Sequence, residues 1–285
     1  MYGLQAITNG AMLGCAYALL GVGMTMFLGI MRLTNLAHGE LVVLGAYLSA
    51  LLVRTFGFPP VATLFLTMPL MFLFGYVIQY GLINRAMFQG SESALLVTFG
   101  LSMILRDALR LIFTVDAQHI ASPYVLQTVR LGPLEIASLD MLLLLIALSV
   151  IASLTLFLRF TYVGRAIRAT TDDTMAAALA GIPVRRIRAI ATGIAAAAAA
   201  AAGLCVGMKW TFYPDSGGRY LLISFVIVVI GGTNSVPGAL LAGLVFGAAQ
   251  AVGGSQHGTL ISYVLLLLIL AIRPQGLFGM SAGES

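Results

Sequence analysis

The segment Asn35-Leu-Ala-His38-Gly39-Glu40 places an amide, an imidazole, a glycine and a carboxylate within six residues, between two apolar stretches. Such groups can hydrogen-bond a small polar solute, and a helix that breaks inside a membrane also frees backbone groups for this purpose. Alternatively, the segment is a turn at the membrane surface with Asn35 as the N-cap of the next helix. The sequence leaves both interpretations open.

A second polar interruption reads Gly231-Gly232-Thr233-Asn234-Ser235-Val236-Pro237-Gly238. Interrupted hydrophobic segments are typical of solute sites near the middle of a membrane. We therefore treat Gly232, Thr233, Asn234 and Ser235 as candidate pathway residues. The competing interpretation is a tight turn between two ordinary helices.

Charged residues also occur at the end of an apolar segment, in the pattern Arg106-Asp107-x-x-Arg110. Ionisable residues inside a membrane are functional by default. Here Asp107 can neutralise either arginine, so the pattern favours an internal ion pair or a headgroup anchor.

Residues 159–188 form the most basic part of the chain. They contain six of its fifteen Lys and Arg residues, and short basic loops between membrane spans stay in the cytoplasm. The middle of this loop predicts a short helix with N-caps at Thr171 and Asp172, ending at Gly181 and Pro183. A helix at this surface is suited to docking a motor or a regulator.

The elements that position these motifs are membrane helices. The 285 residues are 60% hydrophobic and only 9% charged, whereas a soluble domain carries roughly 25% charged residues. A span needs about 20 apolar residues. Apolar segments occur at about 5–30, 39–55, 60–83, 93–114, 139–158, 188–208, 220–232, 238–253 and 259–272. We expect one all-α transmembrane domain over residues 1–285, a polytopic bundle of about eight or nine segments with broken or re-entrant helices.

The basic loop sets the expected orientation. With residues 159–188 inside, Arg85 also lies inside, whereas Arg54, the segment 115–138 and the N-terminus lie outside. No basic segment precedes the first apolar run, so we expect this run to be retained and not cleaved as a signal peptide.

Small residues predict close helix packing. They are the alanines of 195–202 and the pairs Gly10-x-x-x-Gly14 and Gly243-x-x-x-Gly247. Cys15 and Cys205 lie in apolar runs, which indicates two small buried side chains and no disulfide.

The sequence contains no nucleophile elbow, metal-binding pattern or P-loop, and no isolated carboxylate in the middle of a span. This argues against an intramembrane enzyme and an ion-driven carrier. The net charge of +5 lies mostly in one loop, so nucleic acid is not an expected partner. Energy for uphill transport would have to come from another subunit.

Together these motifs resemble the inner-membrane permease subunits of bacterial ABC importers for branched-chain amino acids, over about residues 5–279. The resemblance is carried by Asn35-Leu-Ala-His-Gly-Glu-Leu with Leu44-Gly-Ala-Tyr, Thr98-Phe-Gly-Leu-Ser, Gly164-Arg-Ala-Ile-Arg-Ala with Ala180-Gly-Ile, Ile230-Gly-Gly-Thr-Asn-Ser-Val-Pro-Gly-Ala, and Arg273-Pro-Gln-Gly-Leu-Phe-Gly.

The resemblance implies a bacterial inner-membrane transport subunit that is not an enzyme and binds no cofactor. Its implied partners are a second homologous permease subunit in a heterodimer, two cytosolic ATPases that hydrolyse ATP, a periplasmic binding protein and membrane lipid. Relatives of this type also move urea or short amides, and a passive channel or ion-coupled carrier is the alternative from another class.

The resemblance also assigns residues. The loop matches the ABC permease pattern Glu-Ala-Ala-x-x-x-Gly, with Met175 in place of the acid. The implied ATPase-coupling residues are Arg165, Arg168, Asp172, Asp173, Ala176, Ala177, Leu179, Gly181 and Ile182. The implied substrate-path residues are Asn35, His38, Gly39, Glu40, Thr98, Gly232, Thr233, Asn234 and Ser235.

Overall fold

A computed structural model describes residues 2–31, 35–124, 128–131, 134–233, 235–273 and 276 of the chain. Its long helices are α1 (Tyr2–Met31), α2 (His38–Phe56), α3 (Leu64–Ile78), α5 (Ser91–Phe113), α6 (Ser138–Phe160), α9 (Val184–Lys209), α10 (Gly217–Gly231), α11 (Val236–Val252) and α12 (Gly254–Ile272). The shorter elements are η1 (Pro60–Thr63), the π-helical turn η2 (Gln79–Ile83), α4 (Asn84–Met87), β1 (Thr128–Leu131), β2 (Leu134–Ala137), α7 (Tyr162–Asp172), α8 (Thr174–Leu179) and η3 (Pro214–Ser216).

Each expected apolar segment coincides with one long helix, which confirms the polytopic helical bundle. Six described helical stretches are long and apolar enough to cross a membrane: Thr8–Gly29, His38–Phe56, Pro60–Met87, Ser138–Phe160, Val184–Lys209 and Pro214–Gly231. Val236–Val252 and Leu260–Ile272 are shorter. Helix α5 is 23 residues long but carries four charged residues, Glu92 and the Arg106–Asp107–Arg110 group.

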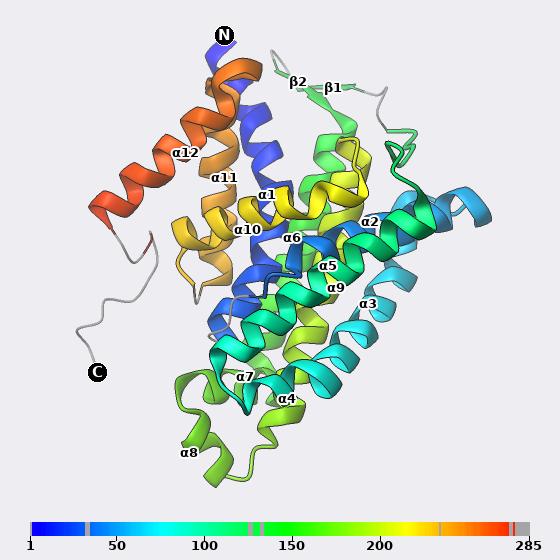
Figure 1. Ribbon diagram of the computed structural model, residues 1–285. Helices are drawn as coiled ribbons and strands as arrows, with labels where there is room; N and C mark the ends of the chain where they lie inside the picture. Colours follow the sequence, from blue (N-terminus) through cyan, green and yellow to red (C-terminus); the bar gives the residue numbers. More distant parts are fainter. Residues whose placement is uncertain are drawn as a thin grey trace.

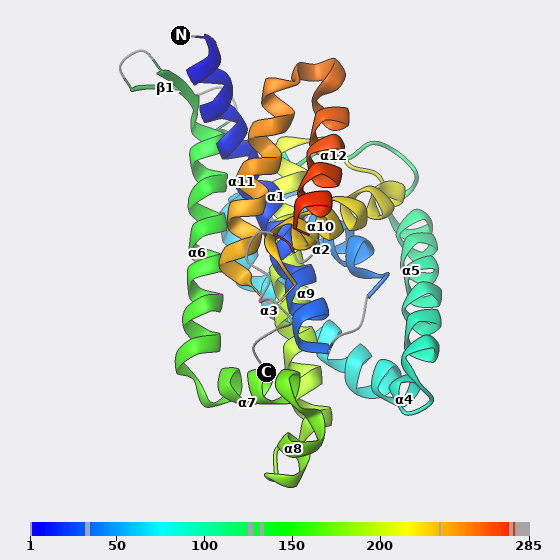
Figure 2. The same ribbon diagram turned by 90° about the vertical axis from the view of Figure 1, so that its left-hand side faces the viewer.

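The two ends of the bundle differ in structure. The N-terminus of α1 and the β1–β2 hairpin lie at one end, whereas α4, α7 and α8 lie at the other (Figures 1 and 2). This agrees with the expected orientation, in which the segment 115–138 and the basic loop lie on opposite sides. The hairpin departs from an all-helical chain, and its strands pair Val129 with Ile136 and Arg130 with Glu135.

Helices α2 and α10 lie across the direction of α1 and α6, which run along the bundle (Figures 1 and 2). The stretch Pro214–Gly231 therefore has the length and composition of a span, but its helix α10 does not run parallel to α1 and α6. This arrangement fits the expected presence of re-entrant helices.

The alanine-rich helix α9 lies at the centre and packs against α1, α2 and α3. A Cβ built on Gly45 would lie 2.6 Å from the Cα of Ala200, and one on Gly75 would lie 2.7 Å from the Cβ of Ala196. The predicted close packing of the 195–202 run is thus confirmed. Cys205, on the same helix, and Cys15 are buried free thiols, as expected.

The two Gly-x-x-x-Gly faces pack against each other between α1 and α11. A Cβ on Gly243 would lie 2.6 Å from the carbonyl oxygen of Gly14, and one on Gly10 would lie 2.8 Å from that of Gly247. Real Cβ atoms do not approach this closely, so the backbones touch only because side chains are missing.

Candidate functional site

The first polar interruption lies beside the middle of α1. His38 Nε2 is 3.1 Å from the carbonyl oxygen of Leu20, and a Cβ on Gly23 would lie 2.6 Å from His38 Cε1. Leu20 is nine residues before the end of the apolar stretch Thr8–Gly29, or about 13 Å along the helix. Helix α2 therefore begins beside the middle of this apolar stretch, which favours a break inside the membrane over a surface turn.

The residues of this break hold the turn together. Asn35 Oδ1 accepts a hydrogen bond from the backbone N–H of Ala37 at 3.0 Å, and the Asn35 carbonyl oxygen accepts one from the N–H of His38 at 3.2 Å. This is an Asx turn. The N-cap of α2 is Ala37, without a side-chain bond, so the proposed N-cap role of Asn35 is wrong.

His38 connects two helices. Its side chain is fully buried against the ring of Phe27, 5.7 Å away between ring centroids. Because a carbonyl oxygen can only accept, Nε2 carries the proton that is donated to Leu20. Nδ1 has no hydrogen-bond partner within the described chain. In this conformation the imidazole joins α2 to α1.

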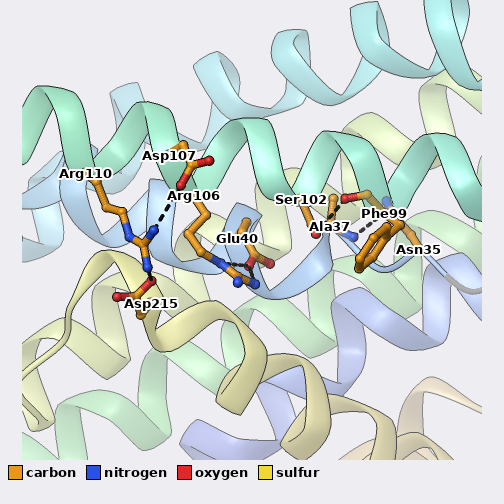
Figure 3. A network of polar contacts seen from close by, with 9 residues as sticks. All are labelled: Asn35, Ala37, Glu40, Phe99, Ser102, Arg106, Asp107, Arg110 and Asp215. Carbon is orange, nitrogen blue, oxygen red and sulfur yellow. Dashed lines mark hydrogen bonds and ion pairs between the residues drawn. The ribbon is translucent and has the colours of Figure 1, made fainter.

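Helix α5 brings a second motif to the same turn. Thr98 Oγ1 accepts from the backbone N–H of Leu36 at 3.4 Å and donates to the Leu95 carbonyl oxygen at 2.9 Å. Figure 3 shows Ser102 and Arg106 following on the face of α5 turned toward residues 35–40. Two motifs separated by 60 residues in sequence therefore meet, which the sequence did not reveal.

Glu40 is the buried charge of this cluster. Its side chain is 1% exposed, and Oε1 accepts from Arg106 Nη2 at 2.9 Å and Nε at 3.3 Å. A Cβ on Gly217 would lie 2.5 Å from the Glu40 carboxyl carbon. The carboxylate thus lies at the N-termini of α2 and α10, where partial positive charges favour an anion.

The Arg106–Arg110 pattern forms the expected internal ion pair, and one of its arginines also has a partner on another helix. Asp107 pairs with Arg110, at 3.1 Å, but Arg106 pairs with Glu40 instead. Arg110 also contacts Asp215 of η3 at 2.5 Å (Figure 3). The charges of α5 therefore serve tertiary contacts with α2 and with the start of α10, which no local spacing could indicate.

The Gly-rich break has the geometry of a tight turn. Gly232 adopts φ +91°, and Ser235 Oγ caps α11 by accepting from the N–H of Gly238 at 2.9 Å. A Cβ on Gly231 would lie 2.6 Å from the carbonyl carbon of Gly238. Thr233 is exposed. Asn234 lies outside the described residues.

The described close contacts of the two candidate breaks are with different parts of the structure. The close contacts at Gly231, Gly232 and Gly238 are with one another and with Gly276. The described contacts of residues 35–40 are instead with α1, with α5 and with the start of α10.

The basic loop contains two helices in place of the single helix expected over 172–183. Helix α7 ends at Asp172, and Asp173 Oδ1 caps α8 by accepting from the N–H groups of Met175 at 2.8 Å and Ala176 at 3.0 Å. The N-cap is therefore neither Thr171 nor Asp172, because Thr170 to Asp172 still belong to α7. The predicted end is confirmed, with Gly181 at φ +81°.

Helix α8 projects beyond the rest of the bundle at the end opposite the N-terminus (Figure 2). Leu179 is 82% exposed, and Ala176 is exposed as well. Ala177 is buried, contrary to the expectation that it faces outward. Ile182 is half-buried. The remaining candidate coupling residues are exposed: Arg165, Arg168, Asp172, Asp173 and Gly181.

A buried polar network joins η2 and α4 to α9 and was not predicted from the sequence. Gln79 Nε2 donates to Asn84 Oδ1 at 3.0 Å, Gln79 Oε1 accepts from Thr192 Oγ1 at 3.0 Å, and Asn84 Nδ2 donates to the Arg185 carbonyl oxygen at 3.1 Å. Gln79 begins the π-helical turn, a form found often at functional sites. The sequence feature that could have indicated this network is the pair of amide side chains, Gln79 and Asn84, at the end of an apolar segment.

Long apolar helices, a helix that starts beside the middle of α1 and a short helix that projects from the basic loop are features of a multi-pass membrane protein. Residues 6–272 match the family model described as "Branched-chain amino acid transport system / permease component", and the chain belongs to this family. It is a transport subunit of the inner membrane.

Curated relatives cover nearly the whole chain. The high-affinity branched-chain amino acid transport system permease protein LivH of Salmonella typhimurium is 30% identical over 98% of this chain and 96% of its own length. The corresponding BraD of Pseudomonas aeruginosa is 31% identical over 97% and 95%. A probable LivH of Methanocaldococcus jannaschii is 24% identical over 97% and 93%. Among solved structures, none matches this chain.

Proposed function

We propose that this permease forms part of the translocation path of an ATP-driven importer for leucine, isoleucine and valine. The observation that carries the proposal is the similarity, at about 30% identity over nearly full length, to permeases named for high-affinity branched-chain amino acid transport. The candidate path begins at residues 35–40 and Thr98, where α2 starts at mid-depth. Residues 232–235 are a second candidate stretch.

The proposed assembly contains a second homologous permease subunit, two cytosolic ATPases and a periplasmic binding protein. ATP would be hydrolysed by the ATPases, because this sequence has no Walker loop. Helix α8 is the proposed coupling element, since its exposed Leu179 and Ala176 project from the end of the molecule that carries the basic loop.

Reconstitution tests the proposal. The chain is purified with its candidate partners, placed in proteoliposomes loaded with ATP, and supplied with binding protein and radiolabelled leucine. We expect uptake that requires ATP and binding protein and persists when a protonophore removes the proton gradient. Uptake that follows the proton gradient without an ATPase would support a carrier. Uptake of urea or short amides, but not of leucine, would assign a different substrate to the permease.

A further inference from the structure

Arg219 lies in the first turn of α10, at the mouth of a small cavity between α1 and α10. The cavity has a volume of about 10 Å³ and is lined by Tyr17, Leu20, Trp210, Arg219, Tyr220 and Ile223. This is room for about one water molecule. The guanidinium side chain is exposed, whereas Tyr17 and Tyr220 are buried, so the cation forms the entrance and the rings form the wall.

The cavity lies beside the middle of the apolar stretch of α1, where an exposed arginine is unusual. Tyr17 is nine residues after the start of the apolar stretch Thr8–Gly29, and Leu20 is nine residues before its end. At 1.5 Å per residue, both lie about 13 Å from the ends of that stretch. Arginine at such a depth is costly in lipid and faces a protein interior or a water-filled cavity. The exposed face of Arg219 therefore points to an aqueous path or to a partner subunit.

The neighbouring cations are neutralised within the chain. Arg106 pairs with Glu40, Arg110 with Asp215, and Lys209 with Asp140. Arg219 lies one helical turn after Asp215, yet within the described residues it makes no ion pair. A guanidinium left in this state presents a planar set of donors that matches a carboxylate.

The wall behind Arg219 is apolar and closely packed. The rings of Tyr17 and Trp210 are stacked, with centroids 5.6 Å apart and planes 13° apart. Tyr17 OH donates to Gln250 Oε1 at 2.5 Å, which fixes the phenol. Leu20 and Ile223 add aliphatic surface. A cation next to such a wall suits a ligand with a carboxylate and an apolar body.

We propose that Arg219 binds the carboxylate of the transported amino acid, and that the Trp210 side of the cavity contacts its aliphatic side chain. This assignment rests on the proposed function and names a recognition site within it. The cavity is closed to an amino acid in the conformation described, so binding requires the wall to open. The half-buried Trp210, which follows the end of α9, is the part of this wall that would have to move.

Transport by the assembled complex provides the first test. Arg219→Gln and Arg219→Lys are compared with Arg54→Gln, an exposed arginine at the end of α2 that serves as matched control. The loss of a charge-assisted bond in Arg219→Gln should slow leucine uptake about 10- to 100-fold. Arg219→Lys should retain part of the rate, and Arg54→Gln should match the wild type.

The outcomes separate the two proposals. Uptake by the wild type together with equal uptake by Arg219→Gln would overturn the role of Arg219 and leave the importer function intact. Failure of the wild type to take up any branched-chain amino acid would overturn both.

Ligand binding provides a second test, because Trp210 is the single tryptophan of the chain. In nanodiscs containing the full permease chain, its fluorescence should change on titration with leucine and not with leucinamide, which lacks the carboxylate. Arg219→Gln should abolish this difference. Equal responses to leucine and leucinamide, or an unchanged leucine response in Arg219→Gln, would contradict the assignment.

Discussion

Glu40 and Arg106 form an ion pair that joins the start of α2 to α5 inside the bundle. The carboxylate is 1% exposed and the guanidinium is 33% exposed. The pair also places Glu40 against Gly217, so three helices meet at one charge. The mid-depth start of α2 is thus held by an electrostatic contact, in addition to the backbone bonds of the Asx turn.

Breaking this pair should destabilise the protein. Glu40→Gln and Arg106→Gln should each cost about 1–3 kcal/mol, below the range for a fully buried pair because Arg106 is partly solvated. The double variant should cost less than the sum of the two. Thermal unfolding of the detergent-solubilised protein measures this, and strict additivity of the two losses would show that the pair contributes nothing.

The α1–α11 contact should not tolerate a side chain at Gly14. Gly14→Val would force the backbones apart, and we expect loss of folded protein at the membrane. Gly100→Ala is the control, because a Cβ there meets nothing within 4 Å; in a helix interior it should be neutral or stabilising by about 0.5–1 kcal/mol. Membrane yield and monodispersity on size exclusion report both. Normal yield of Gly14→Val would contradict the contact.

Gly181→Val should disturb the end of α8. Its φ of +81° is a conformation that costs a β-branched residue about 1–2 kcal/mol, whereas Asn tolerates it better. No neighbour lies within 4 Å of a built Cβ, so the effect comes from the backbone and not from a clash. We expect Gly181→Val to reduce transport per ATP hydrolysed, with Gly181→Asn intermediate. Equal ratios of uptake to hydrolysis in all three proteins would remove α8 from the coupling proposal.

A cysteine at position 35 should report opening of the break. Asn35 is 1% exposed, and the native Cys15 and Cys205 are buried, so background labelling should be low. We expect Asn35→Cys to be almost inert to a water-soluble maleimide at rest and to react faster when ATP and loaded binding protein are added. Phe99→Cys, at a position 47% exposed, is the comparison for an exposed site. No change in rate under turnover would argue against a path at this break.

The features that were predictable from the sequence are those that depend on local residue patterns. Apolar runs located the helices, and the Gly-x-x-x-Gly pairs and the alanine run predicted close packing, because these depend on residue type at fixed spacing. The partner of Arg106 was not predictable, since Glu40 is 66 residues away and their contact depends on how α2 and α5 are oriented. The break between α7 and α8 was missed because Asp172 and Asp173 are equally good N-caps by composition. The position of Arg219 beside the middle of α1 was not predictable, because it depends on α10 lying across α1.

The run of alanines at 195–202 has a consequence for sequence variation. A stretch of one small residue is usually expected to tolerate substitution. Here, however, the backbones of neighbouring helices lie against it, because Gly45 faces Ala200 and Gly75 faces Ala196. A single added methylene at either alanine would meet α2 or α3 with no free volume to enter. At Ala196 and Ala200 the uniform composition therefore reflects a geometric restriction on which substitutions the fold tolerates.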